Sequence, residues 1–291
     1  MITKILMTVA YLLLAPAAGC IFEGLGRMLS AVLEGRAGAT LLQPYYDVRK
    51  LLEKDSMSPS PHQDLYLLIH MIFTLAAGGV FFAGGDLMLV VVLQITATAF
   101  AVTAAYSSGS PYSVLGARRK MLMMMACQPM IIATAVGFYI YKDTFGVREL
   151  AGSGGMALLP MAGLFLGFIY IMTIKLEAAP FDLGASGSGI HELVSGTETE
   201  YTGRTLGVMK MMGWYERVTM FGILFLFLSN GRVTGYIVGI LVCAAVYFLQ
   251  VIGGGVLSRV KPDFALRSAW VITIALGIVN YFVLQFVIEG V

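Results

Sequence analysis

The stretch from Lys175 to Arg217, KLEAAPFDLGASGSGIHELVSGTETEYTGRTLGVMKMMGWYER, lies between two long apolar segments of the chain. Its six carboxylates alternate with apolar residues, a pattern that argues against a freely solvated loop. Ionisable groups held between membrane segments usually mark a path for protons or cations. The simpler alternative is a solvated charged loop that only connects two spans.

The composition places the chain in a membrane. Of its 291 residues, 58% are hydrophobic and only 12% are charged, whereas about a quarter of the residues in a soluble domain are charged. The three cysteines, Cys20, Cys127 and Cys243, are far apart and lie in apolar segments. No pair of them has the spacing of a zinc or iron–sulfur site, so we predict no metal site in this chain.

The apolar segments are long enough for eight transmembrane helices, since a span needs about 20 apolar residues. We predict spans at 3–26, 64–84, 87–107, 121–141, 156–176, 215–231, 233–257 and 268–288. All should be α-helices, because the sequence lacks the alternating pattern of a membrane barrel. Residues 1–291 are therefore expected to form a single all-α membrane domain.

The lysines and arginines determine the expected orientation. Fifteen of the 19 lie in or beside the loops that follow the first, third, fifth and seventh spans. The positive-inside rule then places these loops in the cytoplasm and both termini outside. The two long loops, 27–63 and 177–214, are both expected on the cytoplasmic side.

The first long loop is expected to contain a short amphipathic helix. Apolar residues recur at helical spacing at positions 41, 42, 45, 48, 51 and 52, and charged residues fill the opposite face. Such a helix lies along the membrane surface, and Pro44 can occupy its first turn. It is either an interfacial anchor or a docking platform for a cytoplasmic partner.

Polar side chains inside the spans bear on an ion path. His70, in the second span, is either a packed, hydrogen-bonded residue or a proton relay. Gln128 precedes Pro129 in the fourth span, and its amide can hold water but cannot itself carry a proton's charge. The basic run 118–120 is expected to snorkel to the cytoplasmic interface.

Three motifs carry a family resemblance: GRAGATLLQPYYDVRKLL at 35–52, LGARRKMLMMMACQPM at 115–130, and EAAPFDL at 177–183 followed by HELVSGTETEYTGR at 191–204. Together they resemble the eight-span subunit that anchors the hydrophilic arm in respiratory complex I and in the group 4 membrane-bound [NiFe] hydrogenases. The direct run from Arg36 to Leu41 and the pair Tyr45–Tyr46 are similar to the hydrogenase branch.

The resemblance implies the membrane anchor and coupling subunit of an Ech-like, energy-converting hydrogenase that links ferredoxin-dependent hydrogen metabolism to proton or sodium translocation. The implied partners are the hydrophilic large and small subunits, antiporter-like membrane subunits and the lipid of a prokaryotic plasma membrane; no nucleic acid is expected. The nickel–iron centre and the iron–sulfur clusters would lie on the soluble partners, so this chain would hold no cofactor.

The resemblance also directs attention to particular residues. The predicted ion-path and coupling residues are Glu177, Asp182, Glu192, Glu198, Glu200, Glu216, Gln128 and His70. The predicted arm-docking residues are Arg36, Gln43, Tyr45, Tyr46, Asp47, Arg49, Lys50 and Arg204. The family usually has tyrosine–glutamate where this chain has Cys127–Gln128. Glu23 is a further candidate, or it simply pairs with Arg27 four residues on.

Two alternatives remain open. One is the quinone-binding membrane subunit of a complex I type NADH dehydrogenase, which would bind a quinone and respond to quinone-site inhibitors. The other is a free-standing cation/proton antiporter. An antiporter would transport ions by itself and would be expected to contain an inverted internal repeat; the sequence has no such repeat.

Overall fold

The computed structural model describes residues 2–57, 60–152, 155–178, 180–181, 196–258 and 260–289, with only the backbone of 286–289. This part of the chain is helical and contains no strand beyond an isolated bridge between Asp86 and Gly146. The elements are α1 (Ile2–Leu33), α2 (Gln43–Leu52), α3 (Pro61–Phe82), α4 (Leu87–Ser107), α5 (Pro111–Lys142), α6 (Val147–Gly152), α7 (Ala162–Lys175), η1 (Gly196–Glu198), α8 (Gly203–Leu226), α9 (Val233–Val256), α10 (Pro262–Ile272), the π-helical η2 (Thr273–Ile278) and α11 (Val279–Glu289).

The all-helical membrane architecture is confirmed. Six helical segments in the described residues are long and apolar enough to cross a membrane: α1, α3, α4, α5, α9 and the continuous run from α10 into α11. The other two predicted spans correspond to α7, which is apolar but only 14 residues long, and to α8. α8 carries Lys210, Glu216 and Arg217 among its apolar residues.

Local sequence signals explain where several helices begin. Ser60 caps α3 by accepting a hydrogen bond from the backbone N–H of His62, and Pro61 occupies the first helical position. The Asp86 side chain caps α4 by accepting from the backbone N–H groups of Met88 and Leu89. Side-chain oxygens at this position satisfy N–H groups that have no partner inside the helix.

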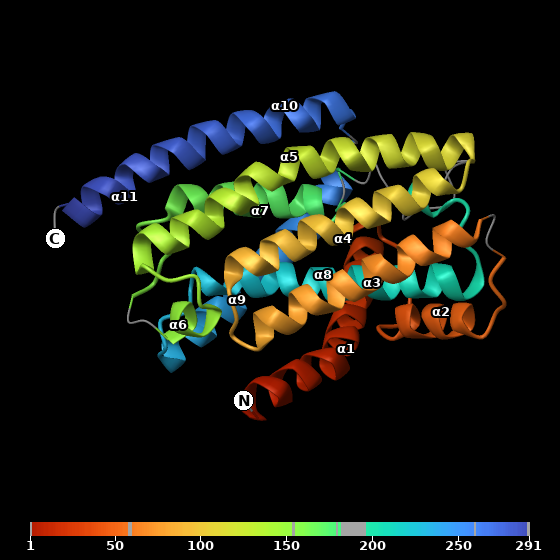
Figure 1. The fold of residues 1–291 in the computed structure, drawn as a ribbon, viewed down its shortest axis with the longest axis horizontal. Coiled ribbons are helices and arrows are strands. Elements are labelled where there is room, and N and C mark those ends of the chain that lie inside the picture. Colours follow the sequence, from red (N-terminus) through yellow and green to blue (C-terminus); the bar gives the residue numbers. More distant parts are fainter. Residues whose placement is uncertain are drawn as a thin grey trace.

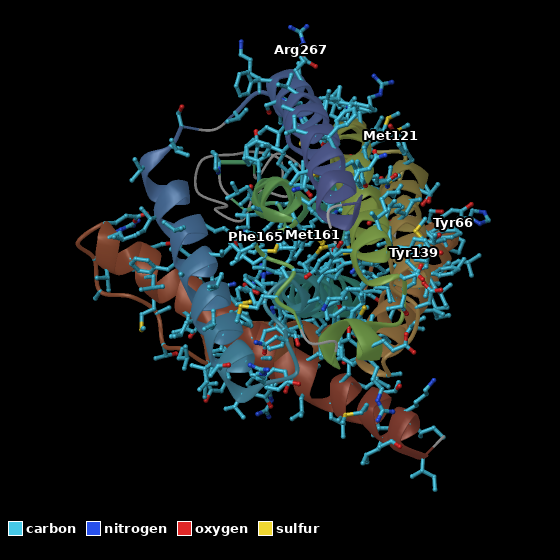
Figure 2. The ribbon with its side chains drawn as sticks, turned by 90° about the vertical axis from the view of Figure 1, so that its left-hand side faces the viewer. Tyr66, Met121, Tyr139, Met161, Phe165 and Arg267 are labelled. Carbon is cyan, nitrogen blue, oxygen red and sulfur yellow. The ribbon has the colours of Figure 1, made fainter. Side chains whose placement is uncertain are left out.

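α5 occupies the middle of the bundle. It packs against α4, α7, α10 and η1, while α8 packs against α1, α2, α3 and α9 (Figure 1). The core between them is closely filled, and Met161 and Phe165 lie in the interior of the bundle (Figure 2). Tyr66, Met121 and Tyr139 lie toward the periphery in the same view.

The two ends of the bundle are formed by different elements. α2 and the beginning of α8 lie at one end, and α6 lies at the other (Figure 1). α1 begins and α11 ends toward the α6 end. The first long loop and the end of the second therefore meet on one side, and the connections predicted to lie outside the cell are on the opposite side.

The short amphipathic helix is confirmed as α2. It buries Pro44 and Val48, and Val48 packs against Cys20 of α1 and Trp214 of α8. Leu51 and Leu52 lie against Gly207 of α8, whereas Tyr45 is 50% exposed. α2 therefore rests on protein through Val48, Leu51 and Leu52 and presents both Tyr45 and Tyr46 outward.

Candidate functional site

A buried polar cavity of about 120 Å³ lies among α3, α4, α5, α7, α8 and η1. This volume is enough for several water molecules. Its polar lining residues are His70, Thr98, Lys120, Lys175, Glu177, Glu198, Glu216 and Arg217. Polar groups rarely gather in this way inside a membrane bundle unless they serve a function.

One ion pair crosses the cavity between α7 and α8. The Lys175 ammonium lies 2.8 Å from a carboxylate oxygen of Glu216, and the lysine side chain is only 8% exposed. The same ammonium donates to the Thr98 hydroxyl at 2.5 Å. Lys175 therefore ties three helices together through one charge, since buried charges persist only when they are paired and hydrogen-bonded.

A second ion pair joins α5 to the residues after α7. Lys120 lies 3.0 Å from Glu177, and both side chains are 17% exposed. The prediction that Lys120 snorkels to the interface is therefore wrong, because α5 begins nine residues earlier, at Pro111, and Lys120 points inward. Glu177 holds its carboxylate there from a left-handed backbone conformation, with φ at 48°, which is costly for a residue other than glycine.

Glu198 adds a third acid to the cavity. It is the last residue of η1, and η1 packs against α5. The backbone of Gly196 and Thr197 lies so close to Gly116 of α5 that a side chain at position 116 would collide with it. Burial raises the pKa of the Glu198 carboxyl above its ordinary value, and the positive charge of Lys120 opposes this rise. A carboxyl with a raised pKa can take up and release a proton closer to neutral pH.

His70 forms the wall of the cavity on α3. The side chain is buried, and its Nδ1 lies 2.8 Å from the backbone carbonyl of Ala97 on α4. This is the packed, hydrogen-bonded arrangement, which is one of the two interpretations that the sequence allows for His70. Because the ring also lines the cavity, the role of His70 as a proton relay stays a prediction.

A smaller cavity of about 10 Å³ continues from Lys175 between α4 and α5. Gln94 and Gln128 both line it, and Lys175 lines both cavities. The Gln94 carbonyl and the Gln128 amide nitrogen are buried without a hydrogen-bond partner among the described protein atoms. A space of this size holds about one water, which could satisfy both groups.

The predicted ion-path residues fall into three groups. Glu177, Glu198, Glu216 and His70 meet at the larger cavity, and Gln128 lies at the smaller one. Glu200 is half-buried and lies outside the lining of the larger cavity. Asp182 and Glu192 lie outside the described residues.

The cationic half of the site is not predicted from the sequence. Lys120 and Lys175 are visible there only as positive charges at the ends of spans, and neither Thr98 nor Gln94 stands out. A lysine at the end of an apolar helix, two residues before an acid, was the available signal at Lys175. The identity of its partner, Glu216, depends on how α7 and α8 pack and is not contained in either segment alone.

The predicted docking residues gather around α2. Arg27 of α1 donates to Asp47 at 2.7 Å and to Glu23 at 2.6 Å, and the Trp214 indole of α8 donates to the other oxygen of Glu23. Burial would raise the pKa of Asp47, but hydrogen bonds from Arg27 and Gln43 outweigh it, so the pKa is lowered. Asp47 therefore ties α2 to α1, and Gln43 donates to the Asp47 carboxylate from within α2.

The remaining docking candidates face outward. Tyr45, Tyr46, Arg49 and Lys50 are exposed on α2, and Arg49 pairs with Glu53, the residue that directly follows the helix. Arg36 is exposed and pairs with Glu34. Arg204, at the start of α8, lies 3.7 Å from Asp55, just after α2. The pairing of Glu23 with Arg27 is confirmed.

This arrangement defines a class: a multi-pass helical membrane subunit with a buried charged cavity near the end that carries α2. The chain belongs to the NADH dehydrogenase family, whose model matches residues 3–285. It is of the type of membrane subunit shared by complex I and the membrane-bound hydrogenases. It is 23% identical to formate hydrogenlyase subunit 4 of Escherichia coli (strain K12), over 87% of this chain and 90% of that protein.

Two further comparisons are consistent with this family. The chain is 26% identical to a subunit of NADH-quinone oxidoreductase from Bacillus thuringiensis (strain Al Hakam), over 96% of this chain and 93% of that protein. Its fold matches a chain in the membrane-bound sulfane sulfur reductase, an archaeal respiratory membrane complex, with a TM-score of 0.79. That match covers 95% of this chain and 99% of the other at 22% identity.

Proposed function

We propose that this chain is the anchor and coupling subunit of an energy-converting, ion-translocating [NiFe] hydrogenase. In this role α2 and its surroundings seat the hydrophilic arm, and the charged cavity beneath links redox chemistry in the arm to proton or sodium movement through neighbouring membrane subunits. The nickel–iron centre and the iron–sulfur clusters would belong to the hydrophilic subunits, and reduced ferredoxin would supply the electrons.

The buried cavity carries this proposal. Two ion pairs, Lys120–Glu177 and Lys175–Glu216, line it together with a third carboxylate, that of Glu198. In the proposal Lys120 exchanges Glu177 for Glu198, because all three residues line one small space. Glu198 is the cavity carboxyl that lies outside the two ion pairs described above, and its pKa is raised by burial. A change of charge or position in the arm would shift the balance between the Lys120–Glu177 and Lys175–Glu216 pairs. Lys175 would pass that shift to the water site beside Gln94 and Gln128.

The hydrogenase branch is favoured by two features of the docking region. The connection between α1 and α2 runs directly from Arg36 to Leu41, without the longer insertion of quinone-using relatives. The adjacent tyrosines, Tyr45 and Tyr46, are both exposed on α2 and are available to a partner. Similarity to formate hydrogenlyase subunit 4 and to hydrogenase-4 component C of Escherichia coli (strain K12) supports the same branch.

The test separates catalysis from pumping. Glu198→Gln and Glu216→Gln are introduced into the intact complex, and inverted membrane vesicles are supplied with reduced ferredoxin. Hydrogen evolution should persist while ion uptake into the vesicles falls severalfold. Glu149→Gln, an exposed acid on α6, serves as the control and should leave both rates unchanged. Unchanged ion uptake in both cavity variants would overturn the coupling role.

The complex I type alternative is favoured by the near-complete alignment with the NADH-quinone oxidoreductase subunit. It predicts a bound quinone and inhibition by quinone-site inhibitors. Isolation of the complex through a tag on this chain distinguishes the two functions. A nickel-containing large subunit supports the hydrogenase assignment, and an NADH-oxidising module with bound quinone supports the alternative.

A further inference from the structure

A third cavity, of about 650 Å³, lies among α1, α3, α6, α8 and α9. Its walls are mostly apolar, and five phenylalanines line it: Phe22, Phe81, Phe82, Phe221 and Phe225. It shares no lining residue with the charged cavity. It includes residues of α6 and of the turn after α3, which lie at the end of the bundle opposite α2 (Figure 1).

The shape of this cavity follows from the path of α1. At its inner part α1 is joined to α9, where the Tyr247 hydroxyl donates to the backbone carbonyl of Phe22. Toward its beginning α1 turns instead to α3, where Thr8 donates to the Gly79 carbonyl at 3.4 Å and Tyr11 stacks on Phe82. α1 and α9 therefore diverge from one another (Figure 2).

The space between the diverging helices is a V-shaped groove with α8 as its floor. Gly222 lies in that floor, and the ring of Phe81 occupies the space a side chain there would take. Along α1 the groove extends from Lys4 to Phe22, at most about 27 Å by helical rise. One leaflet contributes about 15 Å of hydrocarbon, so the groove is long enough for an acyl chain.

Two basic side chains lie at the wide end of the groove. Lys4 belongs to the start of α1, and Arg148 lies on α6, held against the left-handed turn at Gly84. Both are exposed, and within the described ranges neither has a carboxylate partner. Basic residues beside an apolar pocket between helices are the arrangement that binds an anionic lipid headgroup.

We propose that this groove is a binding site for an anionic phospholipid. An acyl chain lies between α1 and α9 over the aromatic floor, and the headgroup phosphate lies between Lys4 and Arg148. By the charge distribution of the loops, the lipid comes from the outer leaflet. Burying each methylene of the chain stabilises binding, and the two cations select for negative charge.

The groove itself can be tested by filling it. Ala244 and Ala245 of α9 are both exposed, but only Ala244 lines the groove. The purified complex, carrying Ala244→Phe or the matched control Ala245→Phe, is stripped of lipid in detergent and titrated with phosphatidylglycerol, with bound lipid counted by native mass spectrometry. Ala244→Phe should remove one bound phosphatidylglycerol, and Ala245→Phe should retain it.

The cations are tested in the same assay with Lys4→Ala and Arg148→Ala. Each change should weaken phosphatidylglycerol binding about fivefold, and neither should alter the weaker binding of phosphatidylcholine. Equal phosphatidylglycerol binding by wild type and Ala244→Phe would overturn the site. Loss with Ala244→Phe but no effect of either cation variant would indicate an uncharged occupant, such as an isoprenoid, and would overturn the anionic lipid.

Discussion

Lys175 connects the two polar cavities. Its ammonium bonds Glu216 and Thr98 in the larger cavity, and its side chain lines the smaller one beside Gln94 and Gln128. Gln128 is a neutral amide where the family usually has a glutamate. On the proposed ion path, the charges that adjoin the Gln128 cavity are therefore those of the Lys175–Glu216 pair, and the proposal requires this pair to be intact.

The pair can be examined by a double-mutant cycle. Lys175→Met leaves the Glu216 carboxylate buried without its partner, and this should destabilise the complex by about 3 kcal/mol. Glu216→Gln leaves the lysine unpaired and should cost a similar amount. Because the double variant removes both charges, its loss should be smaller than the sum by at least about 1 kcal/mol. Chemical unfolding in detergent micelles measures these differences, and additive losses would contradict a direct pairing.

At the scale of elements, α2 is positioned by close backbone approaches to α1 and α8. The backbone of Leu41 fills the space beside Gly24, and the backbone carbonyl of Asp55 fills the space beside Gly203. Gly203 has φ at 51°, a conformation in which other residues are strained. α2 is thus a fixed platform whose free face carries aromatic and basic side chains.

If α2 seats the hydrophilic arm, its exposed tyrosines should be major contributors to that contact, since tyrosine is enriched among residues that dominate interface energy. Tyr45→Ala combined with Tyr46→Ala should lower the yield of hydrophilic subunits isolated with this chain about tenfold or more. The control is Tyr236→Ala, an exposed tyrosine on α9, which should not change that yield. Full retention of the arm by the α2 variant would contradict the docking role.

The sequence predicts elements better than it predicts their pairing. α4 is predicted at 87–107 and lies at Leu87–Ser107, because apolar length and the Asp86 cap coincide. α8 begins 12 residues before the predicted 215, since its first turns carry Arg204 and Lys210 and pack under α2. The acids Glu177, Glu198 and Glu216 are visible as candidates from their setting. Lys120 is not, because only packing distinguishes it from its neighbours Arg118 and Arg119.

At the scale of the whole molecule, two helices differ from an ordinary transmembrane span: α7 is too short, and α8 carries charged residues. α7 would span only about 21 Å at 1.5 Å per residue, less than the ~30 Å hydrocarbon core. α8 carries Glu216 and Arg217 where a lipid-facing helix would be apolar. Both helices lie inside the bundle, packed against α5 and α3 respectively. Protein neighbours therefore cover most of both helices, and charges facing a bundle interior are tolerated.

Fusions to reporter proteins can determine how many of the helical segments cross the membrane. We expect all eight helical segments to cross, which places both termini outside and residue 200, between α7 and α8, in the cytoplasm. Alkaline phosphatase fused after Val291 should be active and green fluorescent protein at the same site dark, whereas fusions truncated after Glu200 should show the reverse. If one of α7 and α8 fails to cross, the fusion after Val291 reverses its signal. If neither crosses, that fusion keeps its signal and the one after Glu200 reverses. Only the eight-span arrangement gives the expected result at both positions, because the fusion after Glu200 reports on α7 alone and the fusion after Val291 reports on α7 and α8 together.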